Sequence, residues 1–150
     1  GLPYVALRYA NVYGPRQDPK SDYAAVIPRF ITALLNGNRP QIFGDGHQSR
    51  DFTFIEDVVS ANLAACTSRE GVGDAMNIAY GTRYSLLAML EILGCIIGVK
   101  PDPEFLPPRP GDVRDSLADI ERAKRAIGFA PRVELGEGLR RTVEFFRRAA

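Results

Sequence analysis

Short apolar runs and longer segments with helical spacing alternate along this chain. The first run, at residues 4–9, is rich in β-branched and aromatic residues and predicts a strand, which the Gly14-Pro15 pair would stop. Further short runs predict extended pieces at residues 41–43, 50–55, 75–80 and 104–106.

Apolar residues that recur every three or four positions predict the helices, at residues 24–35, 58–66, 86–97 and 120–127 and from about residue 135 onward. The helix at 86–97 is apolar nearly all round, so we expect it to be buried, with Ser85 as its N-cap. The last helix would bury Leu139, Val143 and Phe146. Strands separated by helices indicate an α/β fold, although the strands are too few for a complete doubly wound sheet.

The composition is that of an ordinary globular domain. The chain has 150 residues, 45% of them hydrophobic and 25% charged, and a formal net charge of +1, which argues against nucleic-acid binding. Its two cysteines have no metal-ligand spacing, so a cytoplasmic setting is expected, and the apolar run at 86–99 is too short to span a membrane. The chain opens on strand-like sequence, so we expect no signal peptide and an origin in a longer protein.

Candidate chemistry is concentrated in polar residues that follow strands. Asn11 ends the opening strand, and Arg50 and Arg109 lie in loops, where a guanidinium could hold phosphate oxygens. Asp112 could accept hydrogen bonds from sugar hydroxyls, and Phe43 could offer its ring to a base. The alternative is that these arginines form surface ion pairs worth about 0–1 kcal/mol each.

Several familiar sites are absent from the sequence. No Gly-x-Gly-x-x-Gly follows a strand, no phosphate-binding loop is present, and no Cys/His cluster suggests a metal. His47 stands alone in a loop and is expected to be a surface residue. We therefore predict no metal site.

A series of motifs resembles the extended short-chain dehydrogenase/reductase family, in particular its NAD-dependent nucleotide-sugar epimerases and dehydratases. The motifs appear in family order and are LRYANVYGPRQ (7–17), FGDG (43–46), SRDFTFIEDV (49–58), NIAYG (77–81), RPGDV (109–113) and residues 135–146. Residues 18–19, 23–29 and 111–116 are most similar to the UDP-N-acetylglucosamine 4-epimerase branch.

The resemblance implies a fold for this chain and a reaction for the complete enzyme. The chain would be the C-terminal part of an NAD(P)-binding Rossmann-type fold. Over residues 1–150, the last sheet strands would interleave with a small lobe that binds a UDP-sugar. In the complete enzyme, NAD would take a hydride from C4 of the sugar and return it to the other face of a 4-keto intermediate. UDP-glucuronate epimerases, decarboxylases and sugar-nucleotide dehydratases remain alternatives, as does a non-catalytic nucleotide-sugar binding module.

The resemblance also assigns roles to individual residues. Tyr9 and Ala10 would lie near the nicotinamide, and Asn11 would contact the sugar–diphosphate. Phe52 stands where many relatives have tyrosine, so a hydroxyl contact would be lost there. Ser116 matches a position whose bulk decides whether an N-acetylated sugar fits. The other implied contacts are to the nucleotide pocket (Val26, Ile27), the uracil (Gln41, Phe43), the diphosphate (Arg50, Arg109) and the ribose (Phe52, Asp112).

The family's catalytic Tyr-x-x-x-Lys pair has no match in this sequence, because no tyrosine has a lysine four residues later. We therefore predict no catalytic residue in the chain, no epimerase activity from these 150 residues alone, and no tight binding of NAD. The opening strand would lack a neighbour from the N-terminal half. An unpaired apolar edge favours self-association.

Overall fold

The computed structural model describes residues 2–19 and 26–149 and confirms an α/β fold. The strands are β1 (Val5–Tyr9), β2 (Val12–Tyr13), β3 (Gln41–Phe43), β4 (Ser49–Asp51), β5 (Thr53–Phe54), β6 (Asp74–Ile78), β7 (Arg83–Ser85) and β8 (Glu104–Leu106). The helices are α1 (Val26–Leu35), α2 (Ile55–Thr67), α3 (Leu86–Ile97), α4 (Glu121–Ile127) and α5 (Leu135–Ala149). The start predicted for the first helix, at residues 24 and 25, lies outside the described residues.

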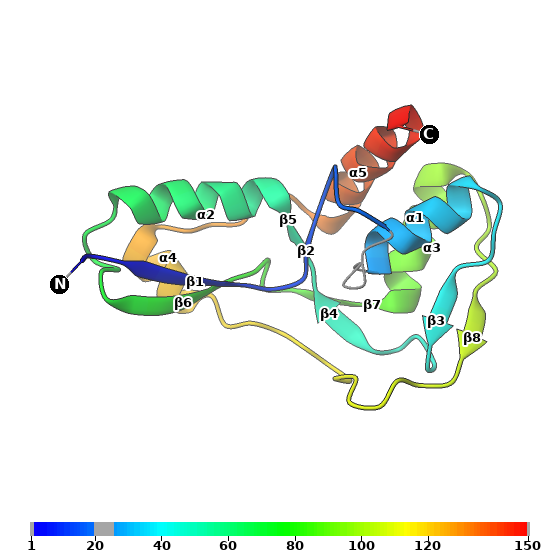
Figure 1. Cartoon of the computed structure of the whole chain (residues 1–150), viewed down its shortest axis with the longest axis horizontal. Coiled ribbons are helices and arrows are strands. Elements are labelled where there is room, and N and C mark those ends of the chain that lie inside the picture. The colour runs from blue at the N-terminus through cyan, green and yellow to red at the C-terminus, as the bar shows by residue number, and fades with distance from the viewer. Residues whose placement is uncertain (1, 20–25, 150) are drawn as a thin grey trace.

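The strands form four pairs that follow one another along the molecule (Figure 1). The pairs β1–β6, β2–β5 and β3–β8 are parallel, and β4–β7 is antiparallel. Strand β7 was not predicted, because its short sequence, Arg-Tyr-Ser, has no strand pattern of its own. It is a strand because it pairs antiparallel with β4, with Tyr84 opposite Arg50.

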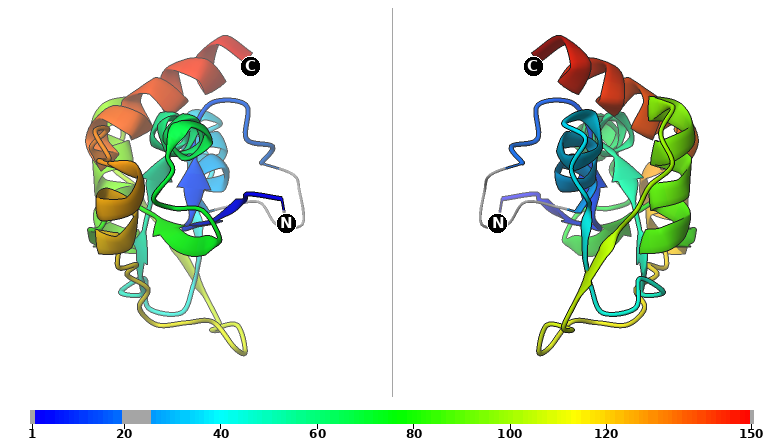
Figure 2. Two further views of the ribbon diagram at one scale, coloured as in Figure 1. Left: turned by 90° about the vertical axis from the view of Figure 1, so that its left-hand side faces the viewer. Right: turned by 90° about the vertical axis from the view of Figure 1, so that its right-hand side faces the viewer.

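Two hydrophobic cores lie at opposite ends of the molecule. The first, here the sheet-end core, joins β1 and β6 to α2 and α4 through residues such as Val58, Met76 and Ile127. The second, here the helical core, packs α1, α3 and α5 together through residues such as Ile31, Leu93 and Leu139. The right-hand view of Figure 2 shows α1 and α3 on this side of the molecule, with α5 crossing above them. The chain crosses between the two cores several times, so neither is built from one continuous segment.

Helix α3 shows how far local pattern predicts burial. Ser85 caps the helix as expected, accepting a hydrogen bond from the Ala88 N–H at 3.1 Å. Leu93 is fully buried, but Glu91 and Cys95 on the other side are exposed. The prediction of a helix buried all round is therefore correct for one face only, because α1 and α5 cover only that face. The predicted buried stripe of α5 is confirmed: Leu139 and Val143 are fully buried and Phe146 packs against them.

Helix α2 begins at Ile55, three residues earlier than predicted. Its first turn carries Glu56 and Asp57, as expected for the positive end of a helix dipole. Asp57 is buried, and its carboxylate accepts hydrogen bonds from the backbone N–H groups of Arg132 and Val133, at 2.9 and 3.2 Å. The carboxylate thus anchors the segment that leads into α5.

Strand β1 pairs with β6 along one edge, and within the described part of the chain its other edge has no strand partner. Exposed apolar side chains lie on β1 and just before it, at Tyr9 and Tyr4, and on α2, at Val59 and Leu63. We call this surface, together with Leu2 and Val72, the β1–α2 face. None of the helices in the described ranges has the length and apolar character that crossing a membrane requires.

Candidate functional site

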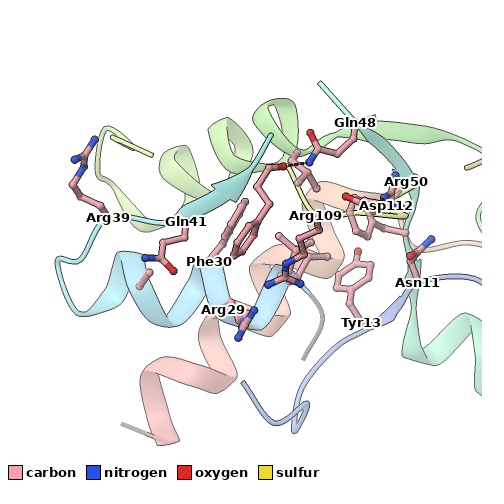
Figure 3. A pocket seen from close by; sticks show the side chains of 16 residues that line it. Asn11, Tyr13, Arg29, Phe30, Arg39, Gln41, Gln48, Arg50, Arg109 and Asp112 are labelled. Carbon is pink, nitrogen blue, oxygen red and sulfur yellow. Dashed lines mark hydrogen bonds and ion pairs between the residues drawn. The ribbon is translucent and has the colours of Figure 1, made fainter. Parts of the chain in front are cut away.

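A cavity of about 400 Å³ lies where α1, β3, β4 and the loop after β8 meet. This size lies within the range of about 300–1,000 Å³ that is typical of small-molecule sites. Figure 3 shows Gln41 and Arg39 at one end, Asn11 and Arg50 at the other, and Arg109 between them. Most of the residues singled out from the sequence line this cavity, namely Asn11, Val26, Ile27, Gln41, Phe43, Arg50, Phe52, Arg109 and Asp112.

Two backbone pairings bring residues far apart in the sequence to this cavity. In the β3–β8 pair, Phe43 lies opposite Leu106, three residues before Arg109. Farther along, the Ser49 N–H donates to the Arg114 carbonyl at 2.9 Å, and the Ser116 N–H donates to the Ser49 carbonyl at 3.1 Å. The loop that carries Arg109 and Asp112 is therefore held at both ends.

Arg50 is committed to its protein neighbours. One terminal nitrogen of its guanidinium (Nη2) contacts the Asp112 carboxylate at 2.5 Å, and the other (Nη1) donates to the Ser49 carbonyl at 2.8 Å. Its side chain is only 16% exposed. Arg50 therefore forms an ion pair, as the alternative expects, but this pair is largely buried on the Arg50 side rather than at the surface, and both partners line the cavity.

Arg109 has a different environment. Its guanidinium carbon lies 3.8 Å from the centre of the Phe43 ring, a cation–π contact. Within the described residues its guanidinium makes no hydrogen bond or ion pair, so its donors are available to a ligand. Arg109 is thus an exposed cation of the cavity, as are Arg29 and Arg39, whereas Arg50 is held by its neighbours.

Asn11 holds a strained corner between β1 and β2. Its φ of 36° lies in the left-handed region, which asparagine tolerates better than most residues. Its side-chain amide donates to the Asp51 carbonyl at 3.0 Å, and its own carbonyl accepts the Thr53 N–H at 3.3 Å. These bonds fix Asn11 against the strand segment that carries Arg50 and Phe52.

Three residues assigned to the site by resemblance do not line the cavity. Tyr9 and Ala10 lie at the carboxyl end of β1, where the Tyr9 hydroxyl donates to Asn62 Oδ1 at 2.9 Å and the Ala10 N–H donates to the Ile78 carbonyl at 3.1 Å. Ser116 is half-buried beside Ser49, at the far end of the loop.

Sequence reasoning missed several lining residues: Tyr13, Arg29, Phe30, Ala33, Arg39, Gln48 and Leu86. The helical spacing of Val26, Arg29, Phe30 and Ala33 places them on one face of α1, so that signal could have identified three of them. Arg39 is an ion-pair partner of Asp102 at 3.0 Å. Tyr13 donates to the Leu135 carbonyl at 3.3 Å, and burial, followed by the nearby Asp57 carboxylate, raises its pKa.

Fold and cavity together define an α/β protein with an arginine-lined cleft between helix α1, strands β3 and β4 and the loop after β8. The sequence model of the NAD dependent epimerase/dehydratase family matches residues 1–79, and the chain belongs to this family. The fold is the C-terminal part of the family's NAD(P)-binding Rossmann-type fold.

Curated relatives and solved structures support the same family. The chain is 44% identical over 138 residues to a UDP-glucose 4-epimerase of Mycolicibacterium smegmatis, which covers 92% of this chain and 44% of the relative. A structure of UDP-glucose 4-epimerase from Thermotoga maritima with UDP-glucose superposes with a TM-score of 0.94 at 44% identity, covering 99% of this chain and 47% of that one.

UDP-N-acetylglucosamine 4-epimerase from Methanobrevibacter ruminantium, in complex with UDP-N-acetylmuramic acid, gives a TM-score of 0.94 at 43% identity, with the same coverage of 99% and 47%. The chain therefore spans about half the length of the relatives that it matches.

Proposed function

We propose that the cavity binds the nucleoside diphosphate of a UDP-sugar. In this proposal the chain is the nucleotide-sugar binding portion of an NAD-dependent UDP-hexose 4-epimerase of the cytoplasm. One observation carries the proposal: a single cavity holds Gln41 and Phe43 toward one end and Arg50, Arg109 and Asp112 beside them. Aromatic and amide groups suit a base, and guanidinium groups suit phosphates.

Calorimetric titration of the protein with UDP-N-acetylglucosamine tests this proposal. Phe43→Ala should weaken binding about tenfold, because base–aromatic stacking is worth about 1–3 kcal/mol. Phe105→Ala is the matched control, since Phe105 is an exposed aromatic residue on the adjacent strand and does not line the cavity. No binding by the unsubstituted protein, or equal losses in both variants, would refute the proposal.

The sugar is proposed to be N-acetylated. Ser116 is small and half-buried, and by family resemblance it lies where a larger side chain would fill the space for an acetamido group. The variant Ser116→Tyr should lose more affinity for UDP-N-acetylglucosamine than for UDP-glucose. Equal loss for both sugars would contradict a size gate. Relatives named as UDP-glucuronate 4-epimerase and dTDP-glucose 4,6-dehydratase, at 36% and 35% identity, represent the competing activities.

NAD would supply the hydride acceptor for the complete reaction. By family resemblance, this chain would contact NAD only near Tyr9 and Ala10, and its sequence contains no glycine-rich turn for the pyrophosphate of the cofactor. We therefore propose that residues outside this chain hold most of the cofactor and supply the general base. A UV-monitored assay of UDP-sugar interconversion by the purified chain should give no turnover, and turnover would overturn this part of the proposal.

A second candidate is a non-catalytic UDP-sugar binding module completed by a separate Rossmann half. The exposed apolar β1–α2 face favours it, because such a surface suits a protein partner. Both candidates, the substrate-binding portion of an epimerase and the non-catalytic module, predict binding of UDP-sugars in calorimetry, whereas a chain with neither function would not bind them. Epimerase activity in the isolated chain would exclude the non-catalytic version.

A further inference from the structure

The contact between Arg109 and Phe43 follows from how the two strands end. Phe43 is the last residue of β3, and the parallel pairing with β8 brings Leu106 opposite it. Pro107 and Pro108 then direct the chain with little backbone freedom toward Arg109. The guanidinium carbon consequently lies 3.8 Å from the centre of the Phe43 ring, which is stacking distance.

A nucleobase that stacks on the face of the Phe43 ring covered by Arg109 would compete with the guanidinium for that face. A flat guanidinium and a flat nucleobase each stack on an aromatic face, so one face of Phe43 accepts one of them at a time. Arg109 makes no hydrogen bond or ion pair within the described residues, so its donors are not committed. Arg50, by contrast, is held by Asp112 and by the Ser49 carbonyl.

We propose that Arg109 and the nucleobase exchange places on the Phe43 ring. This inference rests on the proposed function. The base displaces the guanidinium from Phe43, and the released Arg109 turns its donors to the diphosphate. Arg109 therefore weakens the binding of a ligand that has a base and no phosphate, and strengthens the binding of a ligand that has both. Base and phosphate recognition are coupled through one side chain, although Phe43 lies on β3 and Arg109 lies in the loop after β8.

The coupling has a measurable sign. Uridine, which has a base and no phosphate, must displace Arg109 without compensation. Removing the guanidinium should therefore tighten uridine binding, by about two- to fivefold for an exposed cation–π contact. The same change should weaken UDP binding, because charge-assisted bonds to phosphate are lost. A simple stack of base on Arg109 on Phe43 predicts the opposite sign for uridine.

The experiment is a calorimetric titration of the protein with uridine, inorganic diphosphate and UDP. Arg109→Ala is compared with the matched control Arg114→Ala, which removes an exposed arginine of the same loop that pairs with Asp45 and does not line the cavity. We expect Arg109→Ala to bind uridine more tightly and UDP more weakly than the unsubstituted protein, and Arg114→Ala to change neither.

A second variant checks the coupling itself. In the unsubstituted protein, uridine should strengthen the binding of inorganic diphosphate, because it releases Arg109. In Phe43→Leu this strengthening should disappear, because the guanidinium has no ring to leave. Failure of the unsubstituted protein to bind UDP would remove the proposed function and the exchange with it. Normal UDP binding, with uridine affinity unchanged or lowered in Arg109→Ala, would overturn the exchange alone.

Discussion

The Asp51 carboxylate, between Arg50 and Phe52, is fully buried and ties three parts of the chain together. It accepts hydrogen bonds from the backbone N–H groups of Tyr80 and Gly81, each at 3.0 Å, and of Ala118 at 3.4 Å. Burial raises its pKa, and these hydrogen bonds act in the opposite direction. The carboxylate thereby sets how the strand carrying Arg50 meets the segment that follows Asp112.

Removing this carboxylate should be strongly destabilising. Asp51→Ala leaves buried N–H groups without acceptors, so we expect a loss of about 3 kcal/mol in the free energy of unfolding, measured by urea titration. Asp102→Ala, which removes a surface ion pair with Arg39, should cost less than about 1 kcal/mol. Similar losses for the two variants would contradict the bridging role of Asp51.

Individual cavity residues could be picked from the sequence where the side chain itself carries the chemistry, as for Phe43, Arg50 and Arg109. The role of Asp51 could not, because its partners lie 29 to 67 residues away. Tyr13 was also missed as a lining residue. Its contacts depend on α5, which arrives more than a hundred residues later.

At the scale of elements, helix α5 lies unusually close to β2. A methyl group added at Gly138 would overlap the Tyr13 hydroxyl oxygen and lie 2.9 Å from a ring carbon of Phe54. Gly138→Ala should therefore destabilise the protein by about 1–3 kcal/mol, as measured by thermal unfolding. Gly136→Ala, in the same helix but with open space around it, should be neutral or stabilise by up to about 1 kcal/mol. Equal effects at the two positions would contradict the close crossing.

The first turn of α5 carries a charge network with its own pH dependence. Hydrogen bonds from Arg140 and Arg141 lower the pKa of Glu137 from 4.5 to about 2. Since the folded state favours the ionised form, its stabilising contribution is complete above about pH 4.5 and is lost as the pH falls through about 2. Glu137→Gln should flatten the fall in melting temperature between pH 4.5 and 2. An unchanged slope would show that the network contributes nothing to stability.

Elements with a strong local period were predicted well, as α5 and the Ser85-capped α3 show. Elements defined by a partner were not. Strand β7 is defined by its pairing with β4. Ile55 was predicted to be extended, as its β-branched side chain favours, but it is the first residue of helix α2. The period of a segment is a local property, whereas strand pairing is not.

At the scale of the whole molecule, the β1–α2 face is a surface that suits a partner. The edge of β1 that has no strand partner in the described part of the chain can pair with another strand, and Leu63 on α2 is 67% exposed. We therefore propose that the isolated chain self-associates through this face. Light scattering over a range of concentrations should show a rising mass, which Leu63→Glu should reduce. Val99→Glu, at an exposed apolar residue beyond α3, should leave the association unchanged. A monomer at high concentration would contradict this proposal.

The arrangement of two cores joined by repeated crossings could not be derived from local sequence patterns, because each core combines segments from across the chain. The α/β class was predictable from the alternation of elements. The cavity, whose buried apolar lining belongs to the helical core, depends on the β3–β8 pairing, which nothing in the local sequence specified.

The binding of a UDP-sugar in the cavity is tested most directly by an NMR titration of the protein with UDP-N-acetylglucosamine, following every assigned backbone amide. We expect the largest shifts at the cavity, in β3, β4 and the 109–112 loop, and no shifts in the groove between α3 and α5 around Cys95. Shifts confined to that groove, or no shifts at saturating ligand, would contradict it.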